Sequence, residues 1–192
     1  MTLLQSKTAF VLLGLLKEKP LNPYEIVKVL ERINISRWSP VSASAVYMTI
    51  KVLEKKGLIA GRREKTGAMP EKTVYAVTDA GTGEFMQSLR SYLTEEISDL
   101  AHFNLATLFI CHLERQEAVE VLRARLARLD AEDEGTGRAY DYYRARDGAP
   151  EYALVSLRRN RAHYQAEKQI TEFLVQEILG TDRWGHYLTK GL

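Results

Sequence analysis

The 192-residue sequence contains a single cysteine, Cys111. One cysteine excludes an intramolecular disulfide framework and a zinc cluster of several cysteines, and it fits a reducing compartment, so we expect a cytoplasmic protein. The apolar run Thr8–Leu16 is too short to span a bilayer, and it leads into charged residues without a small-residue cleavage site. We interpret it as a buried helix and expect no membrane partner.

Motifs typical of enzymes are also missing. There is no glycine-rich phosphate loop of Walker or Rossmann spacing, no Gly-x-Ser-x-Gly elbow and no His-Glu-x-x-His metal motif. Four histidines are scattered without the spacing of metal ligands, namely His102, His112, His163 and His186. We therefore expect no catalytic activity, no cofactor and no metal, and we expect Cys111 to be an inert thiol rather than a redox sensor.

The net charge is small, +2, but it is unevenly distributed. Residues 1–90 hold 14 Lys and Arg against 8 Asp and Glu, a net +6, whereas the remaining residues hold 13 against 17, a net −4. The composition, 45% hydrophobic and 27% charged, is that of a globular protein. If the partner is polyanionic, as double-stranded DNA is, its binding surface belongs to the first part of the chain.

Residues 42–58 predict a helix with one packed face and one presented face. At about 100° per residue, Val46, Ile50 and Leu53 share one narrow arc. The opposite side holds no acidic residue and consists of Ser44, Met48, Lys51 and Lys55. Such a face suits phosphates and base edges, although an ordinary surface helix with solvated lysines has the same pattern.

The ends of this helix are marked by residues with defined capping roles. Ser42 or Ser44 can accept a hydrogen bond from a free backbone N–H at the start, and Gly57 can end the helix in the left-handed conformation. Two helices are expected before it, over residues 5–17 and 24–33, because prolines interrupt the pattern between them. Three short helices joined by brief turns form a helix-turn-helix unit.

A β-hairpin is expected after Gly57. Residues 58–65 and 72–77 alternate partially, and residues 66–71 have turn chemistry. A hairpin that follows a helix-turn-helix is a wing, and its basic residues can straddle a phosphate backbone. These residues are Arg62, Arg63, Lys65 and Lys72. Thr78 or Asp79 is expected to cap the next helix.

Together these segments resemble the PadR-like family of transcriptional regulators. The resemblance covers about residues 10–89 and rests on the order and spacing of several short motifs. They are Leu-Leu-Gly-Leu-Leu at 12–16, Pro-Tyr-Glu-Ile at 23–26, Ser-Ala-Val-Tyr at 44–47, the stretch 53–59, Pro-Glu-Lys at 70–72, and Val-Tyr-Ala-Val-Thr-Asp-Ala-Gly at 74–81. The charged remainder is similar, in length and pattern, to the helical C-terminal domain of the larger family branch that includes virulence-gene regulators.

The resemblance implies a mainly α fold with a small β-hairpin. Residues 1–90 would form a winged helix-turn-helix DNA-binding domain, and residues 91–192 a helical domain for dimerisation and effector binding. It also implies a homodimer whose two recognition helices enter successive major grooves of an inverted-repeat operator, with half-sites about 34 Å apart. The activity expected is that of a repressor relieved by a small aromatic or drug-like effector.

Roles can be assigned within this interface. Lys51 and Lys55 are placed to meet phosphates, and the wing residues Arg62, Arg63 and Lys72 to hold the backbone beside them. Ser42, Ser44 and Met48 are placed to approach base edges. Tyr47 can donate its hydroxyl to a phosphate, and Tyr24 resembles the second-helix tyrosine of the family, which tends to lie close to the DNA backbone. Packing in the core is the alternative for both tyrosines.

The second half predicts long helices that need a partner. Helices are expected over residues 85–93, 100–113, 116–146 and 151–179. Gly135-Thr136-Gly137 interrupts the third as either a kink or a loss of helical stability, and the acidic run 130–134 is expected to be solvated. Long antiparallel helices bury themselves poorly alone, so pairing of two copies is predicted.

Aromatic residues gather in the same half and allow two interpretations. They can line a pocket for a flat, apolar effector, as the resemblance suggests, or pack in the core and the dimer. They are Tyr140, Tyr142, Tyr143, Tyr152, Tyr164 and Trp184, together with Trp38 of the first half. The alternative to DNA binding is a winged-helix module whose basic face binds an acidic protein.

Overall fold

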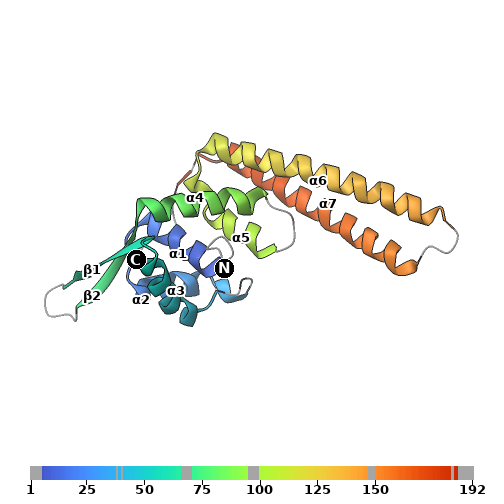
Figure 1. Ribbon diagram of the computed structural model, residues 1–192. Helices are drawn as coiled ribbons and strands as arrows, with labels where there is room; N and C mark the ends of the chain where they lie inside the picture. Colours follow the sequence, from blue (N-terminus) through green and yellow to red (C-terminus); the bar gives the residue numbers. More distant parts are fainter. Residues whose placement is uncertain are drawn as a thin grey trace. The chain divides into compact units, whose positions relative to one another are not determined.

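In the computed structural model, the chain folds into two compact units, one that runs through His112 and one over Leu113–Trp184. The structure describes residues 6–37, 39, 41–65, 71–94, 100–146, 150–182 and 184–185. Helices dominate both units, and one antiparallel hairpin lies in the first (Figure 1). The fold class predicted from the sequence is therefore confirmed.

Helix α1 (Lys7–Glu18) forms the centre of the first unit. All residues from Ala9 to Leu16 are buried, because α1 is covered by α3 (Ala43–Lys55), α4 (Asp79–Thr94) and the second strand of the hairpin. Its apolar residues therefore need to point in every direction, as the sequence indicates. A helix that is apolar all round is typical of a core position.

Local capping chemistry sets the boundaries of the first helices. Asn22 starts α2 (Pro23–Arg32): its side chain accepts from the Glu25 amide at 3.1 Å, and the Glu25 carboxylate accepts from the Asn22 amide at 2.8 Å. This reciprocal capping box satisfies two backbone donors that the helix leaves free. A short 3₁₀ turn, η2 (Ile35–Arg37), then leads toward α3.

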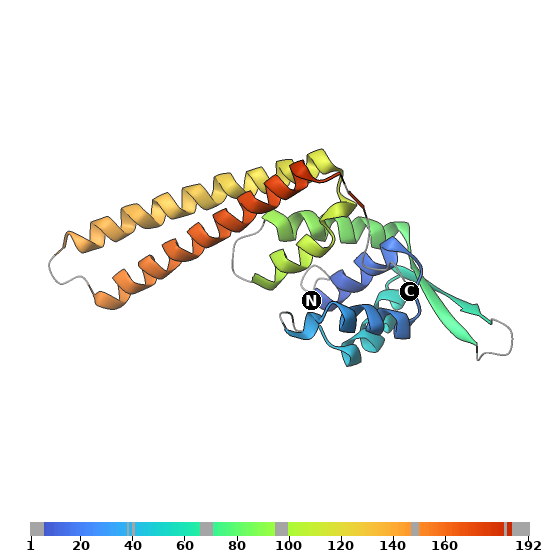
Figure 2. The same cartoon turned by 180° about the vertical axis from the view of Figure 1, so that it is seen from behind.

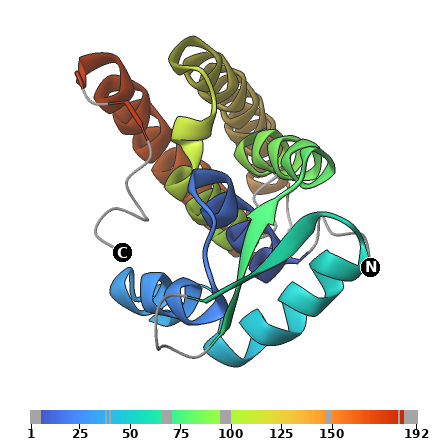
Figure 3. The ribbon, with the colours of Figure 1, turned by 90° about the vertical axis from the view of Figure 1, so that its left-hand side faces the viewer.

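The hairpin consists of β1 (Ile59–Glu64) and β2 (Lys72–Val77) and confirms the predicted wing. Ile59 lies opposite Val77 at the base, and Glu64 opposite Lys72 toward the tip. Leu21 pairs with the other edge of β2, since its amide donates to the Tyr75 carbonyl at 3.0 Å and its carbonyl accepts from the Tyr75 amide at 2.9 Å. Backbone hydrogen bonds therefore attach the base of the wing to the loop before α2, and Figure 3 shows the hairpin beside α3.

Thr78 fixes the junction between the wing and α4. Its hydroxyl donates to the Gly57 carbonyl at 2.7 Å and accepts from the Gly81 amide at 3.1 Å, so it joins the end of α3 to the start of α4. Gly81 is needed for this close approach, because a Cβ there would overlap the carbonyl oxygen of Leu58. Of the two caps proposed from the sequence, the structure uses Thr78.

Helices α4 and α5 (Leu100–Leu108) lie beside α1 (Figure 2), and rings of α4 and of Phe109, just after α5, pack on Phe10 of α1. The Phe10 ring centroid lies 5.2 Å from that of Phe85, 4.7 Å from that of Tyr92 and 5.6 Å from that of Phe109. Because α4 continues through residue 90 in this packing, the compact unit extends to His112. Residue 90 as the end of the DNA-binding part stays a prediction.

The helix expected over residues 100–113 is shorter than predicted. It ends at Leu108 and is followed by a 3₁₀ turn, η3 (Ile110–His112). At this turn the Phe109 ring lies on Gly14 of α1, where a Cβ would come within 2.6 Å of the ring. Burial, aided by the Glu18 carboxylate, raises the pKa of Cys111 to about 11. The thiol therefore stays protonated at neutral pH. Cys111 is only half-buried, and its expected inertness stays a prediction.

The second unit is a hairpin of two long helices, α6 (Arg115–Arg144) and α7 (Glu151–Gly180). Charged pairs join them along their length. Arg125, with 3% of its surface exposed, donates to Glu167 at 2.8 Å, and Arg161 donates to Asp133 at 3.0 Å. Burial lowers the pKa of Arg125, and the Glu167 carboxylate opposes this shift.

The glycines and the acidic run of α6 lie within one continuous helix. The helix runs through Gly135–Gly137 without ending, and Gly137 is buried: a Cβ there would lie 3.3 Å from Cζ of Arg161. The glycine thus gives the Arg161 side chain room beside α6. The acidic run 130–134 is only partly solvated, because Asp130 pairs with Lys168 and Asp133 with Arg161.

None of the described helices is long and apolar enough to cross a membrane. Within the described ranges, no group of three or more His, Cys, Asp or Glu side chains is placed to hold a metal ion.

Candidate nucleic-acid interface

Helix α3 has the two faces that its sequence predicts. Val46, Ile50 and Leu53 are buried, with 0%, 3% and 0% of their surface exposed. On the opposite side Met48 is 66% exposed, and Ser44, Lys51 and Lys55 are exposed as well. The helix is therefore held to its unit by one apolar stripe and presents the other side to solvent.

The two serines lie together at the start of α3. Ser42 is the N-cap, since its hydroxyl oxygen accepts from the Ala45 amide at 3.3 Å, and it lies 3.1 Å from the Ser44 hydroxyl. At the other end, Gly57 has a φ of +70°, the left-handed conformation expected after the helix. Ser42 is therefore occupied by capping, and Ser44 is the better placed of the two to approach a base.

Lys51 and Lys55 lie one helical turn apart on the presented side. Among the described residues, neither lysine forms an ion pair. No acidic residue shares the arc of α3 on which the two lysines lie. The exposed Glu54 lies toward the wing instead, with its Oε1 atom 2.9 Å from where a Cβ on Gly61 would be. Burial, and secondarily this carboxylate, raises the pKa of Tyr75 at the base of the wing.

Both tyrosines predicted to approach the DNA backbone lie on the surface. Tyr24 is 61% exposed and Tyr47 is 52% exposed, so core packing, the alternative for both, is wrong. The Lys28 ammonium lies 4.6 Å from the centroid of the Tyr24 ring. This cation–π pair places a positive charge beside the first turn of α2.

Val52 extends the presented face and was missed by the sequence reasoning. Its side chain is 47% exposed and follows Met48 by one helical turn. An apolar side chain in a major groove can contact the methyl group of thymine. The signal was available, since Val52 lies outside the arc of Val46, Ile50 and Leu53.

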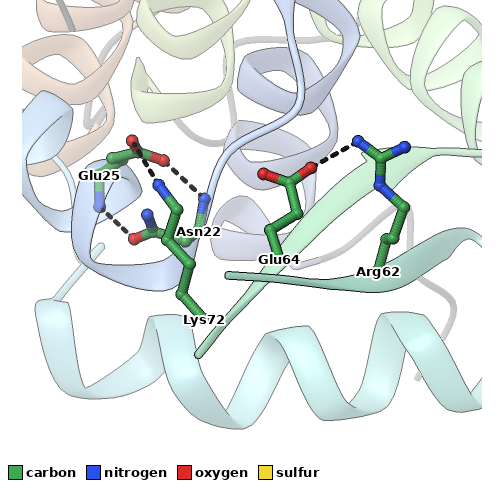
Figure 4. Close-up of polar contacts among 5 residues, drawn as sticks. All are labelled: Asn22, Glu25, Arg62, Glu64 and Lys72. Carbon is green, nitrogen blue, oxygen red and sulfur yellow. Dashed lines mark hydrogen bonds and ion pairs between the residues drawn. The ribbon is translucent and has the colours of Figure 1, made fainter. Parts of the chain in front are cut away.

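The wing carries its predicted cations, but carboxylates accompany three of them. Arg62 donates to Glu64 at 2.5 Å, and Arg63 lies 3.8 Å from a Glu71 oxygen. Lys72 lies 3.8 Å from Glu25, the residue that closes the capping box of α2 (Figure 4). The wing predicted from the sequence contained only the basic residues, without these acidic partners.

Comparison with known proteins gives a consistent family assignment. Residues 12–87 match the family described as "Transcriptional regulator PadR-like family". The negative transcriptional regulator PadR of Bacillus subtilis (strain 168) is 31% identical over 124 residues, which are 64% of this chain and 66% of that protein. The match thus spans slightly less than two thirds of the relative's length.

Solved structures of Bacillus subtilis PadR are similar over most of the chain. The complex with operator DNA is 24% identical, with a TM-score of 0.42, and the match covers 88% of this chain and 98% of that one. The complex with p-coumaric acid is 23% identical, with a TM-score of 0.40, over 90% and 99% of the two chains. Through residues 12–87, which include the helix-turn-helix and the wing, the chain belongs to the PadR-like family of transcriptional regulators.

Proposed function

We propose that this protein is a sequence-specific DNA-binding transcriptional regulator that uses α3 as its recognition helix. The observation that carries the proposal is the presented face of α3, on which Lys51 and Lys55 are exposed and form no ion pair among the described residues. Family membership supports it, and so does the relative from Bacillus subtilis, which is named a negative regulator and has been crystallised with operator DNA. We propose no catalytic role.

In the proposed complex, α3 lies in the major groove and different side chains have different tasks. Lys51 and Lys55 contact phosphates, and the hydroxyls of Tyr24 and Tyr47 donate to neighbouring ones. Base edges are read by three side chains with limited hydrogen-bonding capacity, Ser44, Met48 and Val52. The wing follows the backbone beside the helix. Because these three side chains can form few hydrogen bonds to bases, the spacing of the two half-sites contributes much of the sequence selectivity.

Site selection with purified protein tests this proposal. We expect fragments recovered from genomic DNA to share an inverted repeat whose half-site centres lie about one helical turn, 34 Å, apart. A single unrepeated motif would contradict the two-fold arrangement. Recovery of no motif, together with capture of an acidic protein by the same surface, would instead favour the protein-interaction module.

We infer that α7 mediates homodimer formation. Four large apolar side chains of α7 are more than half exposed, Tyr152 at 76%, Val155 at 67%, Ile170 at 58% and Phe173 at 61%. At about 100° per residue they fall on one side of the helix, away from the buried Thr171, Val175 and Ile178. An apolar stripe formed by these exposed side chains is typical of a protein interface, and two-fold pairing buries it on both copies at once.

Phe173→Asp is expected to convert the dimer to monomers at micromolar concentration, because it places a charge in the apolar stripe. Light scattering coupled to gel filtration measures the mass of the species. Asn160→Asp is the matched control, since Asn160 is also exposed on α7 and this change adds the same charge at least about 80° away from the stripe, so it is expected to leave the dimer intact. A Phe173→Asp variant that stays dimeric would place the interface elsewhere.

We also propose repression that is relieved by a small aromatic effector. Support comes from the relative's name and from its crystal structure with p-coumaric acid. The second unit offers exposed aromatic groups: Tyr142 and Tyr143 are 53% and 39% exposed, and the Arg146 guanidinium carbon lies 4.0 Å from the centroid of the Tyr142 ring. Trp184 donates its indole N–H to the Leu113 carbonyl at 3.1 Å, and Trp38 lies outside the described residues. A regulator of this kind acts where the chromosome is, which fits the cytoplasmic location expected from the sequence.

A further inference from the structure

The charges of the wing and of α3 are arranged differently. Arg62 pairs with Glu64 and Arg63 with Glu71, so within the described residues both arginines of β1 have a carboxylate beside them. Lys51 and Lys55 on α3 have no such partner in the described part of the chain. The recognition helix therefore offers free positive charge to a phosphate, whereas the arginines of the wing are partly neutralised by their own strand neighbours.

Both wing pairs remain open to exchange with DNA. The side chains of Arg62 and Arg63 are 82% and 79% exposed, and those of Glu64 and Glu71 are 32% and 54% exposed. An exposed ion pair of this kind contributes only about 0–1 kcal/mol. A DNA phosphate can therefore take the place of either carboxylate at small cost, but the carboxylate then lies close to the phosphate and repels it.

The register of the hairpin places the two arginines on opposite faces. Arg62 lies opposite Val74 and Arg63 opposite Thr73, and successive residues of a strand point to opposite sides. Glu64 shares a face with Arg62 and lies directly opposite Lys72, which itself reaches Glu25 (Figure 4). Each face of the wing thus combines cations with at least one carboxylate.

Glu25 and the two wing carboxylates have different roles. Glu25 accepts a hydrogen bond from the Asn22 amide at 2.8 Å and so holds the first turn of α2. Among the described contacts, Glu64 and Glu71 hold no helix end; they contact the arginines of β1. Their effect on the wing is therefore electrostatic, and they can be changed without removing a helix cap.

Resting on the DNA-binding function proposed above, we propose that Glu64 and Glu71 are specificity determinants that weaken binding to non-cognate DNA. On non-cognate DNA, where the wing contacts the duplex only loosely, the two carboxylates offset the charges of Arg62 and Arg63. On a cognate site, closer contact brings DNA phosphates near enough to displace the two carboxylates from the arginines. Sequence-independent affinity, which comes almost entirely from phosphate neutralisation, is reduced more than cognate affinity.

The test uses the full chain and a mixed-sequence duplex of about 30 base pairs, long enough for two half-sites one turn apart. Binding is measured by fluorescence anisotropy over a series of salt concentrations for the wild type, Glu64→Gln, Glu71→Gln and the double variant. We expect the double variant to bind this duplex about tenfold more tightly at low salt, with a salt slope steeper by about 1 for each arginine released.

Glu134→Gln is the matched control. Glu134 is an exposed carboxylate that lies 3.6 Å from Arg138 on α6, so this variant has the same charge change and loses a similar exposed pair outside the wing. We expect it to bind as the wild type does. If Glu134→Gln and Glu71→Gln increased the affinity for the duplex equally, the increase would come from net charge alone, and the proposal would be overturned.

The remaining outcomes separate this proposal from the proposed function. If the wild type binds the duplex, Lys51→Ala weakens binding, and the double glutamine variant has an unchanged affinity and salt slope, the role of the carboxylates is wrong and DNA binding stands. If the wild type binds no duplex at low salt, DNA binding itself is wrong and the role of the carboxylates falls with it.

Discussion

Gly81→Ala is expected to lower the free energy of unfolding of the first unit by about 3 kcal/mol. The added Cβ would overlap the Leu58 carbonyl oxygen and would lie 2.9 Å from both the Leu58 carbonyl carbon and Cγ2 of Val77. The Leu58 carbonyl cannot move freely, because it accepts from the Thr78 amide at 3.0 Å. Backbone must therefore shift at the point where α3, the wing and α4 meet.

Denaturant unfolding followed by circular dichroism measures this effect, with Gly83→Ala as the control. Gly83 lies in the same helix, and a Cβ there meets no heavy atom within 4 Å. Alanine is the better helix former, so Gly83→Ala is expected to raise stability by about 0.5–1 kcal/mol. A loss of similar size in both variants would mean that the crowding at Leu58 does not limit residue 81.

This junction also affects the proposed interface. Thr78 bonds to Gly57 at the end of α3 and to Gly81 at the start of α4, and β1 begins two residues after Gly57. The angle between the recognition helix and the wing is thus set by a few hydrogen bonds. A distortion there is expected to change DNA affinity without altering any side chain of the presented face.

Periodicity was sufficient to predict helix α3, with its buried and exposed sides, and the hairpin. Apolar residues that recur at helical spacing lie on one face of a helix. This spacing predicted the buried side of α3, formed by Val46, Ile50 and Leu53, and the exposed side opposite it. Turn residues between two short alternating segments predicted the hairpin. These signals are local, and nothing elsewhere in the chain needed to be known.

Interactions between distant segments could not be predicted in this way. Asp133 and Arg161 lie 28 residues apart, and only the packing of α6 on α7 brings them together. The same packing explains why Gly137 is buried beside Arg161 and why part of the acidic run is paired. The need for glycine at position 81 likewise depends on a distant segment, because the Leu58 carbonyl that crowds it lies 23 residues earlier in the chain.

The acidic partners in the wing are an intermediate case. Glu64 follows Arg62 at a spacing that puts both on one face of a strand, so this pair could have been predicted from the sequence. The approach of Glu71 to Arg63 depends on the hairpin register, and that of Lys72 to Glu25 depends on how the wing sits against α2. Counting cations alone therefore overstated the free charge of the wing.

The double variant Lys51→Ala/Lys55→Ala is expected to lose roughly 100-fold in affinity for a mixed-sequence duplex at low salt. Both lysines lie on the presented face, and each phosphate contact that is lost releases one counterion fewer. Stability is expected to change little, because both side chains are exposed and alanine is a good helix former. Arg123→Ala is the matched control: Arg123 is also exposed but lies on α6, in the second unit.

The salt dependence of DNA binding by these variants is the most direct test of α3 as the recognition helix. We predict that log Kd plotted against log salt concentration has a slope smaller by about 2 for Lys51→Ala/Lys55→Ala than for the wild type, and an unchanged slope for Arg123→Ala. Equal slopes and affinities for the double variant and the wild type would show that α3 does not contact the DNA backbone and is not the recognition helix.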